Sequence, residues 1–204
     1  MRVVHLERKY IRQIVDIHAR AFPKFFLTFL GRGFLREFYR SFLKEENGIS
    51  YIAVDDPGEV VLGVIVGPVS PEVFYKKLVI WRWWAFGFSS LGAVLKNPSI
   101  FKRLLRALKY RGKQPGSSEY ALLSSIAVAP EAQGLGVGKA LLKTWVEEAK
   151  RRKCRGVYLT TDSLDNEAVN HFYQRAGWIL EGTFLTPEGR SMNRYVLSFN
   201  NEEP

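Results

Sequence analysis

Apolar residues along this chain alternate between strand spacing and helix spacing. Short apolar runs, rich in β-branched and aromatic residues, predict strands. Apolar residues that recur at every third or fourth position predict helices. The predicted strands cover residues 2–6, 49–54, 60–66, 120–128, 157–160, 178–184 and 192–199, and the predicted helices cover residues 10–21, 33–44, 136–153 and 165–176. This order predicts an α/β fold in which helices flank a mixed sheet.

Glycine, proline and aspartate mark where these elements end. Pro23 interrupts the first helical pattern, and Gly48 marks the end of the second. The segment Asp55–Glu59 is a strong hairpin turn signal between two strands. We expect Asp165 to cap the last helix and Gly177 to end it.

Length and composition agree with one intracellular enzyme domain. The chain has 204 residues and 47% hydrophobic content, which suffices for a substantial core. We therefore expect a single domain over residues 1–204 with an insertion at about 71–118. Cys154 is the one cysteine, which excludes an internal disulfide and fits a reducing compartment. The N-terminus is charged too early for a signal peptide, so we expect a cytoplasmic protein.

Nearly all of the excess charge lies in the insertion. The whole chain carries a net charge of +10, and the segment from Glu72 to Lys113 holds ten basic residues against one acidic residue. The rest of the chain contributes only +1. The same segment contains Trp81, Trp83 and Trp84. A surface that is basic and aromatic suits an anionic partner.

The insertion contains two patterns that bear on membranes. Residues 78–95 are apolar, but Arg82 and several small residues interrupt them, so we do not expect a span. Residues 100–109 predict a basic amphipathic helix. This helix either packs on its own domain with a solvated basic face or meets an anionic membrane surface or a lipid-linked substrate. Homodimerisation is a further use of the segment, and nucleic-acid binding is disfavoured.

A glycine-rich turn joins the strand at 120–128 to the following helix. Gly134, Gly136 and Gly138 stand at every second position, and Lys139 follows them. Such a turn at a helix start presents backbone N–H groups to an anion. Gln133 stands where a P-loop needs glycine, and Lys139 stands where the dinucleotide fingerprint needs glycine. Both of those phosphate-binding motifs are therefore excluded.

Two sequence blocks carry a resemblance to a known family. Residues 126–138 read Ile-Ala-Val-x-Pro followed by Gln-x-x-Gly-x-Gly, which resembles the acyl-CoA-binding motif of the GNAT (Gcn5-related N-acetyltransferase) superfamily. Residues 166–178 resemble that family's Asn-x-x-Ala-x-x-Phe-Tyr-x-x-x-Gly-aromatic segment. The resemblance covers most of the chain outside the insertion. It implies a GNAT fold with a mixed, mostly antiparallel sheet, and direct acetyl transfer from acetyl-CoA to a primary amine.

The resemblance also assigns residues to the cofactor. Main-chain groups of the central strand would contact the pantetheine arm, and one strand N–H would act as an oxyanion donor. The amides of the glycine-rich turn would hold the pyrophosphate, Asn166 would bind the cofactor arm, and Tyr173 would serve the leaving thiolate. The full implied set is Ile126, Ala127, Val128, Gln133, Gly134, Leu135, Gly136, Val137, Gly138, Lys139, Asn166 and Tyr173.

The general base is not assigned by the resemblance. Many relatives place a glutamate where this chain has Thr161. Asp162 is adjacent, but strand alternation would point it to the opposite face. Glu119, at the start of the central strand, is the other candidate, and a water-mediated path is expected with either. His171 is expected at the surface, and no metal site is expected.

The sequence leaves three functions open. The first is an N-acetyltransferase whose amine acceptor is attached to an anionic carrier, such as a nucleotide-linked or lipid-linked amino sugar. The second is a protein or peptide N-acetyltransferase that uses the insertion for docking. The third is a non-catalytic CoA-binding module, which the retention of both motifs disfavours. The sequence does not separate the first two.

Overall fold

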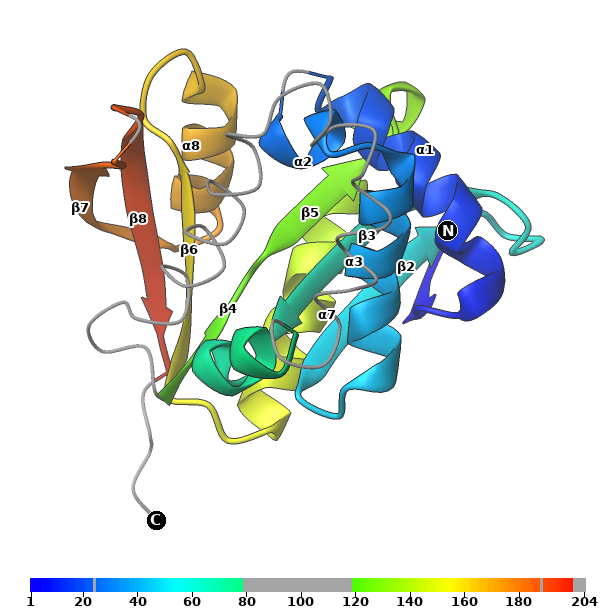
Figure 1. The fold of residues 1–204 in the computed structure, drawn as a ribbon, viewed down its shortest axis with the longest axis horizontal. Coiled ribbons are helices and arrows are strands. Elements are labelled where there is room, and N and C mark those ends of the chain that lie inside the picture. Colours follow the sequence, from blue (N-terminus) through cyan, green and yellow to red (C-terminus); the bar gives the residue numbers. More distant parts are fainter. Residues whose placement is uncertain (24, 79–118, 188, 200–204) are drawn as a thin grey trace.

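The computed structural model describes residues 1–23, 25–78, 119–187 and 189–199 (Figure 1). The strands form two four-stranded sheets. The first sheet has the order β1 (Arg2–His5), β2 (Gly48–Val54), β3 (Val61–Pro68) and β5 (Ser125–Val128). The second has the order β4 (Tyr120–Leu122), β6 (Gly156–Asp162), β8 (Ser191–Ser198) and β7 (Ile179–Leu185).

The predicted mixed, mostly antiparallel arrangement is confirmed. All neighbouring strands are antiparallel except β4 and β6, which run parallel. The single strand that the sequence predicts over residues 120–128 is two strands, β4 and β5, and they belong to different sheets. The connection between them joins the two sheets at one point (Figure 1).

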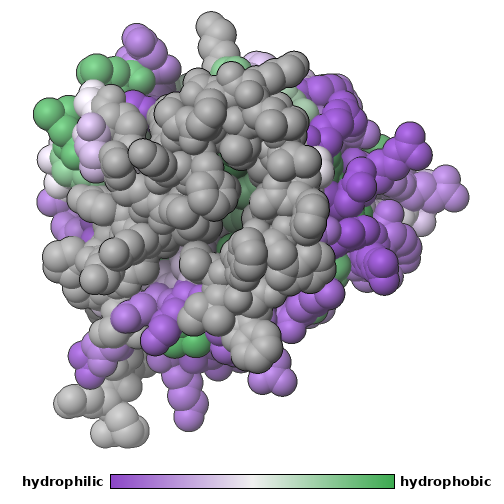
Figure 2. All heavy atoms as spheres, in the orientation of Figure 1, coloured by the Kyte–Doolittle hydropathy of each residue, from purple (hydrophilic) through white to green (hydrophobic). Residues whose placement is uncertain are grey.

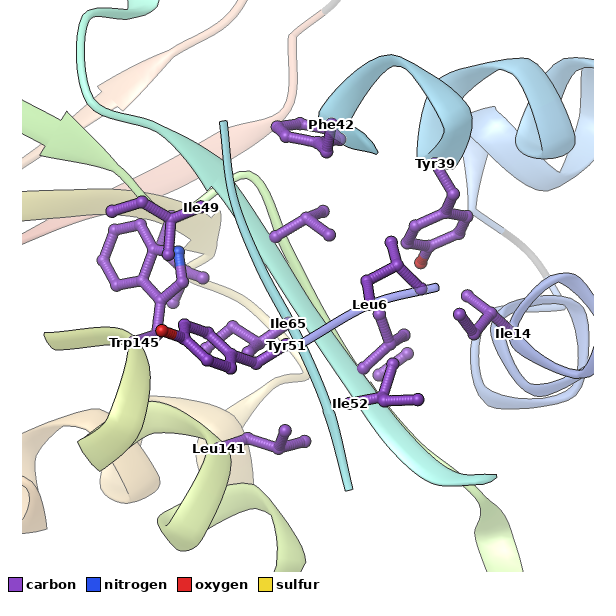
Figure 3. Close-up of a cluster of buried hydrophobic side chains, with 14 of the residues drawn as sticks. Leu6, Ile14, Tyr39, Phe42, Ile49, Tyr51, Ile52, Ile65, Leu141 and Trp145 are labelled. Carbon is purple, nitrogen blue, oxygen red and sulfur yellow. The ribbon is translucent and has the colours of Figure 1, made fainter. Parts of the chain in front are cut away.

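Helices cover both faces of the first sheet. The helices α1 (Ile11–Ala21) and α3 (Arg32–Lys44) lie on one face, and α7 (Val137–Arg151) lies on the other (Figures 1 and 3). Figure 3 shows Ile52 of β2 directed toward Ile14 of α1, whereas Tyr51 is directed toward Leu141 and Trp145 of α7. This alternation is what a strand buried on both faces requires.

Close packing with α7 restricts the side chains of β3. A Cβ atom added to Gly63 would lie 3.0 Å from the Leu141 side chain, and one added to Gly67 would lie 2.7 Å from Trp145. Both distances are shorter than ordinary van der Waals contact. The backbone oxygens of Ala127 and Leu122 would lie closer still, at 2.9 and 2.0 Å, so these glycines admit both the neighbouring strand segments and α7.

The predicted helix ends are confirmed in part. The helix α1 ends at Ala21, just before Pro23, and the short helix α2 (Phe26–Phe29) follows. The prediction that Asp165 caps α8 (Glu167–Arg175) is wrong, because Asn166 occupies the N-cap position. Asp165 has a φ of 52°, so its backbone is left-handed. The Asn166 side chain makes no capping bond and instead reaches back to β6.

The predicted hairpin turn after β2 is held by Asp55. One Asp55 carboxylate oxygen accepts backbone N–H bonds from Gly58, Glu59 and Val60 at 2.9 to 3.0 Å. These bonds, the one from Val60 foremost, lower the pKa of the Asp55 carboxyl. The aspartate thus closes the turn through its side chain.

The first residues of the predicted insertion belong to the core. Residues 71–78 are helical, and Phe74, Tyr75 and Leu78 are buried. The Phe74 ring stacks on Phe42 of α3 with their centroids 4.6 Å apart. Residues 79–118, which include the predicted amphipathic helix at 100–109, lie outside the described residues. The role of that segment stays a prediction.

Three further features are the distribution of hydrophilic residues on the surface, the burial of the one cysteine and the lengths of the helices. On the face drawn in Figure 2, hydrophilic residues gather over the side where α1 and the N-terminus lie in Figure 1. Cys154 is buried, and this burial raises the pKa of its thiol, as suits a structural residue. Within the ranges given above, no helix combines the length and the hydropathy needed to cross a membrane.

Candidate active site

The two sheets part between Leu123 and Ser124. The Leu123 N–H donates to the Tyr158 carbonyl of β6 at 2.9 Å, and the Ser124 N–H donates to the Val66 carbonyl of β3 at 3.0 Å. Beyond this point β5 follows the first sheet and β6 follows the second (Figure 1). Among the described strands, β5 is consequently an edge strand, with β3 on one side and no strand paired with the side that faces the gap.

The open side of β5 presents backbone groups of Ile126 and Val128. The Ala129 N–H donates to the Leu62 carbonyl at 2.9 Å, which places Ala129 on the side that bonds to β3. Hydrogen-bonding direction alternates along an antiparallel strand. Ala127 therefore also bonds toward β3, and Ile126 and Val128 direct their N–H and C=O groups into the gap. An extended ligand can pair with this edge.

The glycine-rich turn forms a cradle at the end of this edge. Gly134 and Gly136 have φ values of 78° and 81°, a left-handed backbone that favours glycine. Apart from the adjacent residues in the chain, no atom of the described residues lies within 4 Å of where a Cβ would stand at either position. Gly136 is the N-cap of α7, and no side chain caps the helix there. The first amides of α7 are thus available to an anion.

Gly138 brings three elements together beside this cradle. A Cβ at Gly138 would lie 3.6 Å from the Phe172 ring of α8 and 3.7 Å from the Val128 side chain of β5. The N-terminus of α7, the edge strand and α8 therefore meet around the glycine-rich turn.

A cavity of about 940 Å³ extends from the cradle to the helices on the opposite face. Its lining contains most of the predicted cofactor residues: Ile126, Val128, Gln133, Gly134, Gly136, Val137, Gly138, Lys139, Asn166 and Tyr173. Two predicted residues are not in the described lining. Ala127 is buried against the core, and the Leu135 side chain is 73% exposed.

Tyr173 lies in the wall of the cavity on α8. Its side chain is buried among aromatic rings, with the Phe172 and Trp178 centroids 5.2 and 5.7 Å from its own. Burial raises the pKa of the Tyr173 hydroxyl above its usual value. Within the described part of the chain, no protein group forms a hydrogen bond with this hydroxyl. Tyr173 therefore offers a protonated hydroxyl at the cavity wall.

Asn166 ties the start of α8 to the end of β6. Its amide nitrogen donates to the Thr161 hydroxyl at 2.8 Å and to the Asp162 carbonyl at 3.0 Å. Asn170, one turn further along α8, donates to the same carbonyl at 3.1 Å. These bonds explain why Asn166 is not free to cap its own helix, and they hold its side chain at the cavity wall.

Asp162 faces the other side of its sheet. Thr161 pairs with Asn193, whose side chain contacts Asn170 of α8, so Thr161 points toward α8. Strand alternation then directs Asp162 away from α8, as the sequence predicts. Its carboxylate accepts two bonds from Arg190 Nη2, at 2.6 and 2.7 Å. The Arg190 guanidinium also lies 5.9 Å from the centre of the Phe25 ring.

Glu119 lies away from the cavity. It forms an ion pair with Arg155 at 2.9 Å, and both side chains are more than half exposed. Glu119 precedes β4 at the end remote from the gap, and it is not among the described residues that line the cavity.

The sequence did not predict a row of three polar side chains, from α1, α3 and β5, that lies on the α1 and α3 side of the cavity. The Nδ1 atom of His18, on α1, lies 2.8 Å from the Tyr39 hydroxyl of α3. That hydroxyl lies 3.4 Å from the Ser125 hydroxyl of β5. Burial lowers the pKa of His18 to about 4, so the ring is neutral at physiological pH. The only sequence signal was the position of His18 one turn after Ile14 on the apolar face of α1.

A pair of hydrogen-bonded hydroxyl groups lies next to this row of polar side chains. The Tyr75 hydroxyl, from the helical residues 71–78, lies 2.8 Å from the Ser124 hydroxyl. Among the described residues, no cluster of histidine, cysteine or carboxylate side chains is arranged to hold a metal ion. The polar groups of the described lining are hydroxyls, amides, the His18 ring, the paired Asp162 and Arg190 side chains and the Lys139 ammonium group.

Known proteins resemble this chain in sequence and in fold. A 54-residue stretch is 41% identical to a mycothiol acetyltransferase of Paenarthrobacter aurescens (strain TC1), but it covers 26% of this chain and only 16% of that protein. The ribosomal-protein-alanine N-acetyltransferase from Brucella melitensis has a TM-score of 0.64 and 15% identity, with 98% of this chain and 100% of that chain covered. The structure of SsHAT has a TM-score of 0.66 and 18% identity, with 96% and 97% covered.

These structural likenesses establish the fold. The sequence pattern described as the acetyltransferase (GNAT) family matches residues 11–178, a range that contains β5, the glycine-rich turn and α8. Acetyl-CoA is the acetyl donor of that family. The chain belongs to the acetyltransferase (GNAT) family.

Proposed function

We propose that this protein is an N-acetyltransferase that moves an acetyl group from acetyl-CoA directly to a primary amine. The observation that carries the proposal is the meeting of three features in one cavity: the open edge of β5, the glycine cradle and the Tyr173 hydroxyl. Each feature has a separate task in this reaction.

The residues present fit acetyl-CoA. The open Ile126 and Val128 backbone groups suit the amide-containing pantetheine arm, and the amides from Gln133 to Lys139 suit the pyrophosphate. Lys139 adds a positive charge at the same end. When bound, acetyl-CoA supplies the acetyl group as a thioester. An N–H of β5 that points into the gap would then stabilise negative charge on the thioester oxygen.

Tyr173 would give a proton to the leaving sulfur. An unperturbed tyrosine has a pKa of about 10, above that of a thiol at about 8.5. Burial raises the Tyr173 pKa further, which keeps the hydroxyl protonated at neutral pH. Its role is therefore to stabilise the forming thiolate through a hydrogen bond, and a proton that passes to the sulfur would be replaced on the tyrosine oxygen from solvent.

Asp162 would take the proton that the amine loses. An amine attacks only in its neutral form, so a proton acceptor is needed near the acceptor. Asp162 is the only carboxylate among the described residues that line the cavity. A carboxylate has about four acceptor positions, so the bonds from Arg190 leave room for a water molecule. Glu119 lies outside the lining and is not proposed for this role.

The identity of the acceptor is a separate question. The idea of an anionic carrier rests on the charge of the insertion at about 71–118, most of which lies in residues 79–118, and the idea of a peptide acceptor rests on the same insertion as a docking surface. Both stay predictions, because residues 79–118 lie outside the described residues.

The proposal is tested by measuring CoA release from acetyl-CoA in the presence of a panel of primary amines. The panel should include arylalkylamines, polyamines, amino sugars and short peptides. We expect acetyl-CoA to bind and at least one amine to increase CoA release well above the rate with acetyl-CoA alone. If acetyl-CoA neither binds nor turns over with any amine, the proposed function is wrong.

A further inference from the structure

The part of the cavity formed by α1 and α3 has an aromatic wall. It is formed by Phe22 and Phe25, which follow α1, and by Phe34 and Phe38 of α3. Phe34 and Phe38 are almost fully buried, so their positions are set by the core. Phe22 and Phe25 are half-buried, and their ring centroids are 5.9 Å apart. We call these four residues the aromatic wall.

The polar groups beside the aromatic wall are uncharged. His18 is neutral, and its Nδ1 atom is engaged by Tyr39 at 2.8 Å. The Tyr75 and Ser124 hydroxyls are engaged by each other at 2.8 Å. These groups offer hydrogen bonds but no charge that could balance a charged ligand.

The charged groups in this part of the cavity cancel each other. Arg190 binds Asp162 through two short bonds and covers the face of Phe25. The remaining charged residue of the described lining is Lys139, which lies at the glycine cradle. Among the described residues, the lining near the aromatic wall therefore has no net charge.

We propose that the part of the acceptor that enters this part of the cavity is an uncharged aromatic or aliphatic body that carries a single primary amine. An arylalkylamine has this chemistry. The inference rests on the proposed function, because it concerns the acceptor of the same acetyl transfer. Aromatic rings bury large apolar areas and pack in offset or edge-to-face pairs, which the aromatic wall provides.

A more polar acceptor would fit this lining poorly. A phosphate placed beside the aromatic wall would meet only the Arg190 guanidinium, which Asp162 already binds, and a second ammonium group would meet only the Asp162 carboxylate, which Arg190 already binds. Either group would lose its hydration without gaining an unpaired partner of opposite charge. A polyamine or a sugar phosphate is therefore disfavoured in this part of the cavity. Any anionic carrier would have to remain outside it.

The first experiment measures binding, so that it does not depend on turnover. Calorimetry should compare 2-phenylethylamine with 1,4-diaminobutane and with glucosamine 6-phosphate, each titrated into the full-length protein in the presence of CoA. We expect 2-phenylethylamine to bind at least about tenfold more tightly than either competitor. If it binds no more tightly than they do, the inference is overturned.

The second experiment tests the aromatic wall directly. Phe25→Ala should weaken 2-phenylethylamine binding at least about fivefold and leave acetyl-CoA binding unchanged. Phe29→Ala is the matched control, because Phe29 is 61% exposed on α2 and is not in the described lining. If Phe25→Ala folds poorly, Phe38→Leu removes part of the wall with less loss of volume. Unchanged binding in a folded variant overturns the inference.

The two proposals fail in different ways. Selective binding of 2-phenylethylamine without CoA release from acetyl-CoA would support the apolar acceptor and count against acetyl transfer. Turnover of polyamines or sugar phosphates in preference to arylalkylamines would support acetyl transfer and overturn the apolar acceptor.

Discussion

Leu123 and Ser124 are neighbours in the chain, yet their backbone N–H groups bond to different sheets. Leu123 donates to Tyr158 in the second sheet, and Ser124 donates to Val66 in the first. A continuous pairing of this strand with β6 would have consumed the backbone groups of Ile126 and Val128. The change of partner at this one peptide leaves them open to a ligand, and it sets the glycine cradle at the end of the opened edge.

The first prediction concerns the glycine cradle. Gly136→Val should cost roughly 1–2 kcal/mol of stability, because the left-handed backbone disfavours residues with a Cβ. It should also abolish the stabilisation by acetyl-CoA, which for the wild type is about 2.7 kcal/mol at a ligand concentration of one hundred times Kd. Thermal unfolding with and without acetyl-CoA measures both effects.

A glycine on β7 provides the control for this substitution. Gly182 has open space around it and is not among the residues with a positive φ. Gly182→Ala should therefore keep the acetyl-CoA stabilisation. If Gly136→Val is stabilised by acetyl-CoA as strongly as the wild type, the cradle does not hold the cofactor.

The second prediction concerns the proton donor. Tyr173→Phe should lower kcat by about ten- to a thousandfold, since a positioned general acid contributes roughly 10² to 10⁴. The acetyl-CoA affinity should stay nearly constant, because the ring remains packed against Phe172 and Trp178. Steady-state kinetics combined with acetyl-CoA titration separates the two effects. Tyr10→Phe, which removes a hydroxyl bonded to Gly58 outside the cavity, should leave kcat unchanged.

The third prediction concerns the Asp162 carboxylate. Asp162→Asn should lower kcat/KM for the amine by about a hundredfold or more, because the proton acceptor is lost. The stability should change by no more than about 1 kcal/mol, since the Asp162–Arg190 pair is more than one third exposed. Glu119→Gln breaks a comparable exposed pair and should leave kcat/KM unchanged. The reverse result, with Glu119 essential and Asp162 dispensable, would invalidate the assignment.

The fourth prediction concerns the pH dependence of stability. Burial lowers the pKa of His18 from 6.5 to about 4, so the unfolded chain binds a proton at His18 between these pH values and the folded chain does not. The free energy of unfolding should consequently fall by about 3 kcal/mol as the pH drops from 6.5 to 4. Above pH 6.5, His18 should add no further pH dependence.

Denaturant unfolding at several pH values measures this effect. The His18→Gln variant should lose the His18 contribution, so the difference between wild type and variant should itself depend on pH over this range. His171→Gln, which changes an exposed histidine of α8, should follow the wild-type profile. A wild-type minus His18→Gln difference that is flat from pH 4 to 6.5 would contradict the prediction.

Local patterns in the sequence determined most of the secondary structure and the residues around the glycine cradle. The glycine-rich turn, the start of α7 and the segment from Asn166 to Tyr173 depend on neighbouring residues, because left-handed turns and helix starts have compact sequence signatures. The sequence also established the family, since the two motifs lie within the residues that the family pattern matches.

Only the tertiary structure decided which residues lie together on the α1 and α3 side of the cavity. His18 and Tyr39 are separated by 21 residues, and Tyr39 and Ser125 by 86, so no periodic pattern links them. Likewise, the sequence offered both Asp162 and Glu119 as bases, and the structure places Asp162 in the cavity lining and Glu119 outside the described lining. The division of residues 120–128 into β4 and β5 could not be predicted from the sequence either. The sequence of an apolar strand does not show which sheet the strand joins, because packing between distant parts of the chain determines its partners.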